Sequence, residues 1–208
     1  MTRKRASMLS HGDPVLKRWE QFLRRNAAIL ASMLGYATIP PLMQLTFSIG
    51  PPWPRSAAVA AITSVFGYLA AVGAYVGHTH ASPSRPNLKR LRLLITRSAI
   101  VSGAAMVLYL SLHTAFVYDA PDPDHQVAGG FLLQPAVANL LFERPGMTKR
   151  DVLDGAEWDA EHVWIPWTVR STNLAIFLSW VSIFICIGAF VSLFVAYLQC
   201  RHALEGST

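Results

Sequence analysis

An uncharged apolar run at residues 174–198 constrains this chain more than any other feature of its sequence. An α-helix rises about 1.5 Å per residue, so roughly 20 apolar residues cross the ~30 Å hydrocarbon core of a bilayer. Predominantly apolar runs of similar length occur at residues 27–49, 56–77 and 93–118. The sequence therefore predicts an all-α integral membrane protein with four transmembrane helices.

The composition agrees with this class of protein. Charged residues make up 14% of the chain, whereas soluble domains carry about 25%. The four runs use nearly half of the 208 residues, so little is left for a soluble core and we expect one membrane domain. The two cysteines, Cys186 and Cys200, are too far apart along one helix to form a disulfide.

Lysine and arginine residues are distributed unevenly between the connections. Thirteen of the 18 lie before the first run, around the second connection or after the last run, and five lie in the other two connections. Cytoplasmic loops are enriched in these residues, so both termini are expected in the cytoplasm and the third connection outside it. The predicted division is a cytoplasmic segment (1–26), transmembrane helices 1–3 (27–118), an extracytoplasmic helical loop (119–170), and helix 4 with a short cytoplasmic tail (171–208).

The N-terminal segment is predicted to form a basic amphipathic helix over residues 13–26. Its apolar side carries Trp19, and its basic side carries Arg24 and Arg25. Such helices bind the surface of an anionic leaflet, so the bilayer with its anionic inner leaflet is an expected partner. The same two arginines also form a candidate docking surface for a cytoplasmic protein, together with Lys89, Arg90 and Arg92.

Prolines and glycines predict where the first helices bend and pack. Pro40 and Pro41 remove backbone donors near the middle of the first run, which predicts a kink. Polar residues on the same run, Gln44 and Thr46, are candidates for lining a pore. Small residues let helix backbones approach closely, and we expect them to face another helix of this chain or of a second copy. The candidate packing glycines are Gly67, Gly73, Gly77 and Gly103.

The long third connection is predicted to form a helical cap. Its apolar segment 131–142 is too short to cross a bilayer and is therefore interfacial, re-entrant or buried in the cap. Thr148 and Asp151 have the spacing of a capping box, which predicts a short helix over 149–154. Tryptophans often anchor proteins at the membrane surface. The candidate anchors are Trp19, Trp53, Trp158, Trp164 and Trp167.

Few residues in the sequence are suited to catalysis, ligand binding or sensing. The sequence contains no catalytic, nucleotide-binding or metal-binding motif, so we predict no catalytic residue, cofactor or metal, and nothing indicates nucleic-acid binding. The four apolar runs contain no Asp or Glu, which argues against a carboxylate proton relay. Histidines titrate near neutral pH, so His113, His162 and the neighbouring Glu161 are candidate sensing residues.

These observations lead to three hypotheses on function. The first is a non-enzymatic, self-associating membrane subunit that is channel-like or acts as a sensor or effector. The second is a membrane anchor that docks a cytoplasmic partner, for example in a bacterial toxin or antiphage defence system. The third is a membrane enzyme that uses outer-loop residues such as His125, Glu161 and His162. In each case we expect the protein in the inner membrane of a bacterial cell.

Overall fold

The computed structural model describes residues 50–53, 56–79, 84–121 and 126–205, together with positions 27, 31, 35, 38–40 and 42. The N-terminal segment with Trp19, Arg24 and Arg25 lies outside these residues. The same holds for Pro41, Gln44 and Thr46 of the first apolar run.

The described positions of the first run lie around the predicted kink. Thr38 is in a turn, whereas Gly35 before it and Ile39 after it are helical. The amide of Leu42 donates to the carbonyl of Thr38 at 3.2 Å, so helical bonding resumes across Pro40, which is itself buried.

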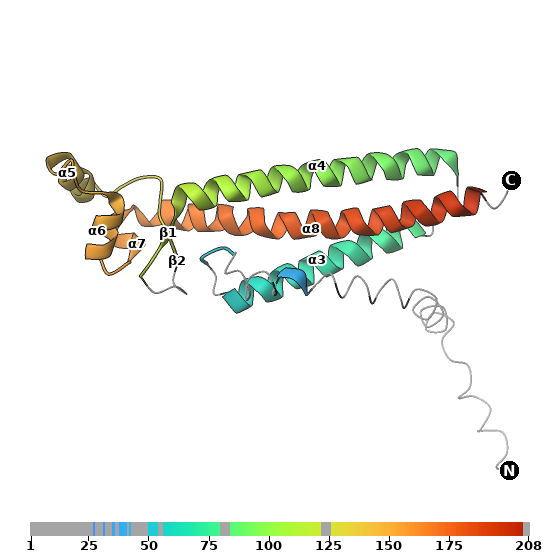
Figure 1. The fold of residues 1–208 in the computed structure, drawn as a ribbon, viewed down its shortest axis with the longest axis horizontal. Helices are drawn as coiled ribbons and strands as arrows, with labels where there is room; N and C mark the ends of the chain where they lie inside the picture. The colour runs from blue at the N-terminus through green and yellow to red at the C-terminus, as the bar shows by residue number, and fades with distance from the viewer. Residues whose placement is uncertain are drawn as a thin grey trace, which may run out of the picture.

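Three long helices dominate the fold, and each is long and apolar enough to cross a membrane. They are α3 (Ser56–Thr79), α4 (Arg85–Phe116) and α8 (Pro166–Glu205). Helix α8 lies between α3 and α4 and packs against both, as Figure 1 shows. The chain is thus mostly helical, and α8 is the central helix of the described bundle.

The ends of these helices differ from the predicted spans. The third span was expected to reach residue 118, but α4 ends at Phe116 and the next residues form a strand. In the other direction α4 starts at Arg85, where the Ser84 side chain accepts a hydrogen bond from the amide of Asn87. Helix α8 has 40 residues and is therefore about 60 Å long, twice the hydrocarbon thickness. Hydropathy marks only the lipid-embedded part, whereas polar residues continue the same helices beyond it.

The largest buried cluster of the bundle lies near the end of the helices that carries the cap, and two smaller clusters lie farther along, around Tyr75 and Leu193. The largest cluster is built from Val59 of α3, Tyr109 of α4, and Ile176, Trp180 and Phe184 of α8, with other buried residues. The rings of Tyr109 and Trp180 are 5.1 Å apart, and those of Trp180 and Phe184 are 5.0 Å apart. Aromatic packing therefore holds α8 against α4 at this level.

The cap contains a β-hairpin, which corrects the prediction of an entirely helical loop. Strands β1 (Val117–Asp119) and β2 (Gln126–Ala128) pair antiparallel, with Tyr118 opposite Val127. Three-residue strands are too short to show a clear alternating pattern, and Val117 and Tyr118 extend the apolar run of α4. The sequence therefore gave no signal that separated them from the helix.

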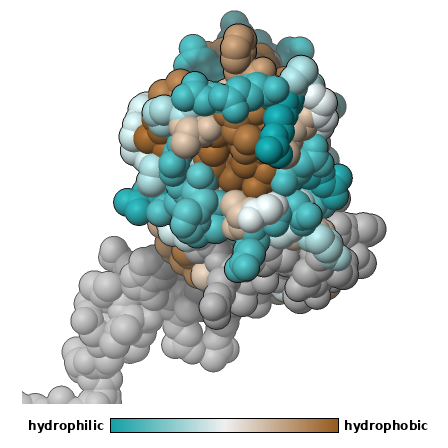
Figure 2. All heavy atoms as spheres, turned by 90° about the vertical axis from the view of Figure 1, so that its left-hand side faces the viewer, coloured by the Kyte–Doolittle hydropathy of each residue, from teal (hydrophilic) through white to brown (hydrophobic). Residues whose placement is uncertain are grey.

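Three short helices complete the cap: α5 (Pro135–Glu143), α6 (Lys149–Gly155) and α7 (Ala160–Val163). The apolar segment 131–142 is helical only from Pro135, which occupies the first turn of α5. The capping box of α6 is confirmed, because the Thr148 and Asp151 side chains each accept a hydrogen bond from the other's backbone amide. Seen from the cap end, hydrophobic residues gather in the middle and hydrophilic residues surround them (Figure 2).

Candidate functional site

The cap and the bundle meet at a closely packed junction. Gly129 and Gly130 follow β2 and are both buried. The Gly129 amide donates to the carbonyl of Phe116 at 2.7 Å. A Cβ atom on Gly129 would lie 2.9 Å from the Trp164 ring, and one on Gly130 would overlap the Thr168 hydroxyl. Only residues without side chains let the hairpin approach the start of α8 this closely.

Trp164 is the central residue of the cap and not an exposed rim residue. It is only 1% exposed and belongs to a hydrophobic cluster with Val137, Leu153 and Val163. Its ring lies 5.4 Å from the ring of Tyr118, and burial there raises the pKa of the Tyr118 hydroxyl. Trp164 therefore packs inside the cap, and its role as a membrane anchor stays a prediction.

The other described tryptophans are placed differently. Trp53 and Trp167 are exposed, and the Trp167 ring meets the Phe131 ring edge-on at 5.1 Å. Trp158 packs against the Trp164 cluster, and its indole N–H donates to Asp154 at 3.0 Å. Trp158 and Glu157 both have positive φ angles, an uncommon conformation for residues with side chains. A tight turn between α6 and α7 thus brings Trp158 back onto the cap.

The candidate sensing pair Glu161 and His162 lies on the surface of α7. Glu161 pairs with Arg170 at 3.2 Å, and His162 pairs with Asp159 at 2.9 Å. The His162 side chain is 75% exposed, so it does not lie at a packed interface. Exposed ion pairs contribute about 0–1 kcal/mol to stability. These two residues thus have the geometry of ordinary surface pairs.

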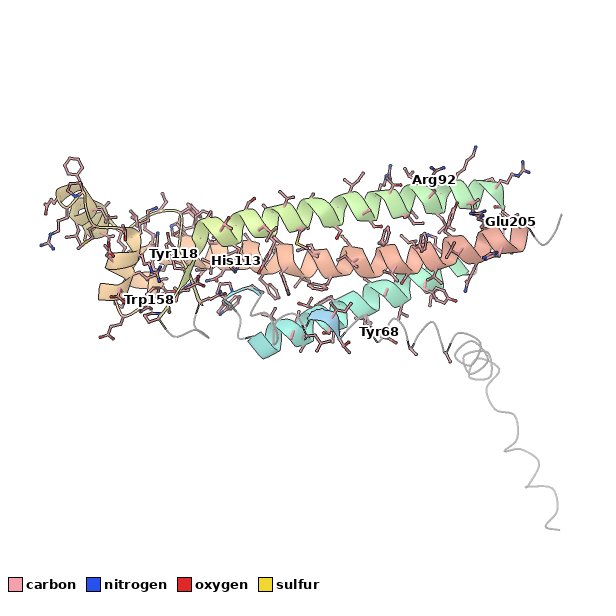
Figure 3. The ribbon with its side chains drawn as sticks, in the orientation of Figure 1. Tyr68, Arg92, His113, Tyr118, Trp158 and Glu205 are labelled. Atoms are coloured by element: carbon pink, nitrogen blue, oxygen red, sulfur yellow. The ribbon has the colours of Figure 1, made fainter. Side chains whose placement is uncertain are left out.

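His113 is placed where the bundle meets the hairpin. It lies in the last turn of α4, with its ring 5.5 Å from the ring of Tyr109. On its other side it interacts with the side chain of Gln126 and the charge of Asp119. Gln126 in turn donates to Asp119 at 2.9 Å. Figure 3 shows His113 near Tyr118, at the end of α4 that carries the cap. His113 therefore lies between the polar side chains of the hairpin and the aromatic residues of the bundle core.

Several buried polar side-chain atoms in the three long helices have no hydrogen-bond partner. They belong to Thr63 and Ser64 of α3, Tyr109 of α4, and Asn173, Trp180 and Ser192 of α8. Buried polar groups without partners are costly and are uncommon in structures. Two of these residues, Tyr109 and Trp180, contact each other in the core beside His113.

The candidate docking residues lie at the opposite end of the molecule. Lys89, Arg90 and Arg92 are exposed, and so are Arg85 and Arg97 of the same helix. Helix α4 contains no acidic residue. Figure 3 shows Arg92 far from the cap, near the end of α8 at Glu205. The structure therefore gathers exposed positive charge at this end of α4.

The candidate packing glycines divide into two groups. Gly67 is buried in the bundle. Gly73 and Gly77 of α3 and Gly103 of α4 are exposed, and a Cβ atom added at any of them would meet nothing within 4 Å. The close helix approach that these three glycines permit is thus not used by the described residues.

Sequence reasoning missed the residues that build the junction. Gly129 and Gly130 are not among the predicted site residues, although two adjacent glycines can signal close backbone approach. Tyr109, Trp180 and Gln126 gave no distinguishing signal. Among the residues that the structure describes, no group of three His, Cys, Asp or Glu side chains could hold a metal ion.

The chain was also compared with known proteins. No protein-family model, no curated protein and no solved structure matches it.

Proposed function

We propose that this protein is a non-catalytic, multipass membrane subunit that assembles with copies of itself. The observation that carries the proposal is the open surface at Gly73 and Gly77, which are spaced as GxxxG on the exposed side of α3. Glycines at this spacing let two membrane helices pack with their backbones close together. An exposed, unfilled glycine surface on a membrane helix therefore favours contact with a second copy.

The exposure of α4 supports the same proposal. In its apolar part only 6% of the residues are buried, compared with 39% in α8. Gly103 lies on this exposed helix and also has open space around it. Helix α4 therefore offers a second surface that lipid or another subunit can cover.

The proposal includes the arrangement in the membrane. Four helices cross the bilayer, with the first apolar run, 27–49, as the additional one. The termini and the basic end of α4 are cytoplasmic, and the cap lies outside. The supporting observation is charge: residues 119–170 carry a net charge of −5, and the rest of the chain carries +11. Pore lining by Gln44 and Thr46 stays a prediction, as does a sensor or effector role.

Self-association can be tested with the full chain in lipid vesicles. Fluorescence energy transfer between labelled copies is measured for the unaltered protein and for the variant Gly73→Ile plus Gly77→Ile. We expect the variant to associate at least about tenfold more weakly, because isoleucine side chains keep the backbones apart. Ala61→Ile is the matched control, since Ala61 is exposed on α3 but lies about 120° around the helix from Gly73. Unchanged association of the double variant, or no association of the unaltered protein, contradicts the proposal.

A second candidate function is the docking of an acidic cytoplasmic partner. It is favoured by the exposed basic residues of α4, which carries no carboxylate to neutralise them. We expect Arg90→Glu plus Arg92→Glu to abolish co-purification of such a partner from native membranes. Arg144→Glu in the cap, also at an exposed position, is the control. Equal recovery of the partner with both variants eliminates this candidate.

A further inference from the structure

An exposed apolar surface lies where the cap joins α8. It consists of Phe131, Leu132 and Trp167, which are 50%, 45% and 55% exposed, and is referred to here as the cap patch. The three residues come from two segments that are brought together by the edge-on contact between the Phe131 and Trp167 rings. Large apolar side chains grouped in this way mark a surface that contacts a membrane or another protein.

The backbone holds the cap patch in place. The Ile165 amide donates to the carbonyl of Leu132 at 3.0 Å, and the Gln134 amide donates to the carbonyl of Val163 at 3.0 Å. Leu133, between them, forms a β-bridge with Trp164. Phe131 and Leu132 are therefore fixed beside the first turn of α8 and cannot turn inward without breaking these bonds.

The cap patch continues an exposed stripe on α8. Leu174 and Leu178 follow Trp167 by seven and eleven residues, so the three lie on one side of the helix. Leu174 and Leu178 are about half exposed, like Trp167. Both leucines belong to the uncharged run 174–198, which is the most apolar part of the chain. The exposed side of this run thus lies on the same side of α8 as the cap patch, with the exposed Ser171 between them.

Distance along α8 places the cap patch at the outer edge of the lipid headgroup layer. Trp167 precedes Leu174 by seven residues, which is about 10 Å of helix. The polar layer of a leaflet is roughly 5–8 Å thick beyond the hydrocarbon edge. Arg170 lies between these levels and pairs with Glu161 at the surface. Tryptophan and phenylalanine beside such polar groups are typical of the membrane interface.

We infer that the cap patch inserts into the headgroup region of the leaflet through which α8 enters the membrane at its N-terminal end. The cap is thereby seated on the bilayer surface and does not stand free in solvent. The inference requires that α8 crosses the bilayer, but it does not require self-association, so the two proposals can fail separately.

Spin labelling of the full chain in phospholipid vesicles tests the inference. Single cysteines at Phe131→Cys, Leu132→Cys and Lys149→Cys are labelled in a background of Cys186→Ser plus Cys200→Ser. The accessibility of each label to oxygen and to a water-soluble nickel chelate is measured. We expect labels 131 and 132 to be at least several-fold more accessible to oxygen relative to the chelate than label 149. Lys149 is the control because it is exposed on α6, away from the cap patch.

Two outcomes overturn the inference. Labels 131 and 132 could be as accessible to the chelate as label 149, which would place the cap patch in water. They could instead be shielded from both reagents, which would mean that a second copy or another protein covers it.

The unaltered protein provides a second measurement, which does not depend on the folding of variants. Vesicles containing a phospholipid with a photoactivated diazirine near its headgroup are irradiated, and the adducts are located by mass spectrometry. Adducts are expected on Phe131, Leu132 or Trp167 and not on α6. Adducts on neither the cap patch nor α6, or on both equally, contradict the inference that the cap patch lies in the headgroup region.

Discussion

Gly130 illustrates how much of the cap depends on a single missing side chain. It lies against Thr168 and Trp164 of the segment that starts α8, although these residues are far from it in the sequence. Any side chain at this position would overlap the Thr168 hydroxyl and crowd the Cβ atoms of Thr168 and Trp164, so these neighbours or the hairpin would have to move. The junction between the cap and α8 is therefore sensitive to the substitution of a single residue.

The first prediction is that Gly130→Ala loosens the cap from α8. Overpacking of this kind typically costs about 1–3 kcal/mol, so local opening of the hairpin should become roughly fivefold to a hundredfold more frequent. The measurement is hydrogen exchange of residues 126–134, followed by mass spectrometry. Gly146→Ala is the control, because a Cβ atom there meets nothing within 4 Å. Equal exchange in the two variants would show that the junction tolerates a side chain.

At the scale of single elements, α8 combines a packed side with an exposed side. Trp180 is buried against Tyr109 and Phe184, whereas Leu178 is exposed two residues earlier. Inside a bilayer the hydrophobic effect does not distinguish these two positions, since lipid chains are as apolar as the bundle. Side-chain packing therefore decides their contributions to stability.

The second prediction compares these two residues. Trp180→Ala should lower the free energy of unfolding by roughly 2–3 kcal/mol, which is less than the ~3–5 kcal/mol seen in soluble cores because lipid fills part of the gap. Leu178→Ala should change it by under about 1 kcal/mol. Unfolding is measured in mixed micelles with increasing SDS. A larger effect at Leu178 than at Trp180 would contradict the packing of the Trp180 side of α8 against α4.

The third prediction concerns the start of α6 and its dependence on pH. The Asp151 carboxylate accepts hydrogen bonds from the backbone amide and from the hydroxyl of Thr148. These bonds, the amide's more than the hydroxyl's, hold the pKa of Asp151 below its usual range. Because the folded pKa is depressed, the stabilisation is present above the unfolded pKa of about 3.9 and is lost as pH falls through the folded value. Exchange protection of α6 amides should therefore fall below about pH 4.

Two variants separate the parts of this capping box. Asp151→Asn should remove the acid-dependent loss of exchange protection in α6. Each variant is compared with the unaltered protein at the same pH. Thr148→Ala should weaken α6 at every pH by about 1 kcal/mol, or about fivefold in its opening equilibrium. An unchanged pH profile in Asp151→Asn would assign the acid sensitivity to another group.

At the scale of the whole molecule, charge and the cap lie at opposite ends of the bundle. The basic residues of α4 are at one end, and the acidic hairpin and cap helices are at the other (Figures 1 and 3). In the proposed arrangement this separation sets the orientation of the molecule across the membrane, since basic segments are retained on the cytoplasmic side.

The fourth prediction is that the two ends face opposite compartments. Single cysteines at Lys149→Cys in the cap and His202→Cys near the end of α8 are introduced in the background of Cys186→Ser plus Cys200→Ser. A maleimide that cannot cross membranes should label position 149 in cells with an intact inner membrane, and position 202 only after permeabilisation. Both positions are exposed, so access to the reagent is limited only by the membrane. Labelling in the reverse order would invert the proposed orientation.

The sequence by itself determined the three long helices of the described structure and the start of α6. Apolar runs of this length are stable in a bilayer only as helices, because each backbone polar group must find its partner within the segment. The capping box is equally local, since Thr148 and Asp151 are three residues apart. Such features depend on neighbours in the chain and can be read from it directly.

Only the tertiary structure decided which side chains these elements bury. Trp164 and Trp167 are three residues apart and similar in sequence context, yet one is the centre of the cap and the other belongs to the cap patch. The glycines of α3 and α4 likewise divide into a buried one and three exposed ones. The physical reason is that burial depends on contacts between segments distant in sequence, such as Gly130 with Thr168 and Leu132 with Ile165, and local patterns carry no record of them.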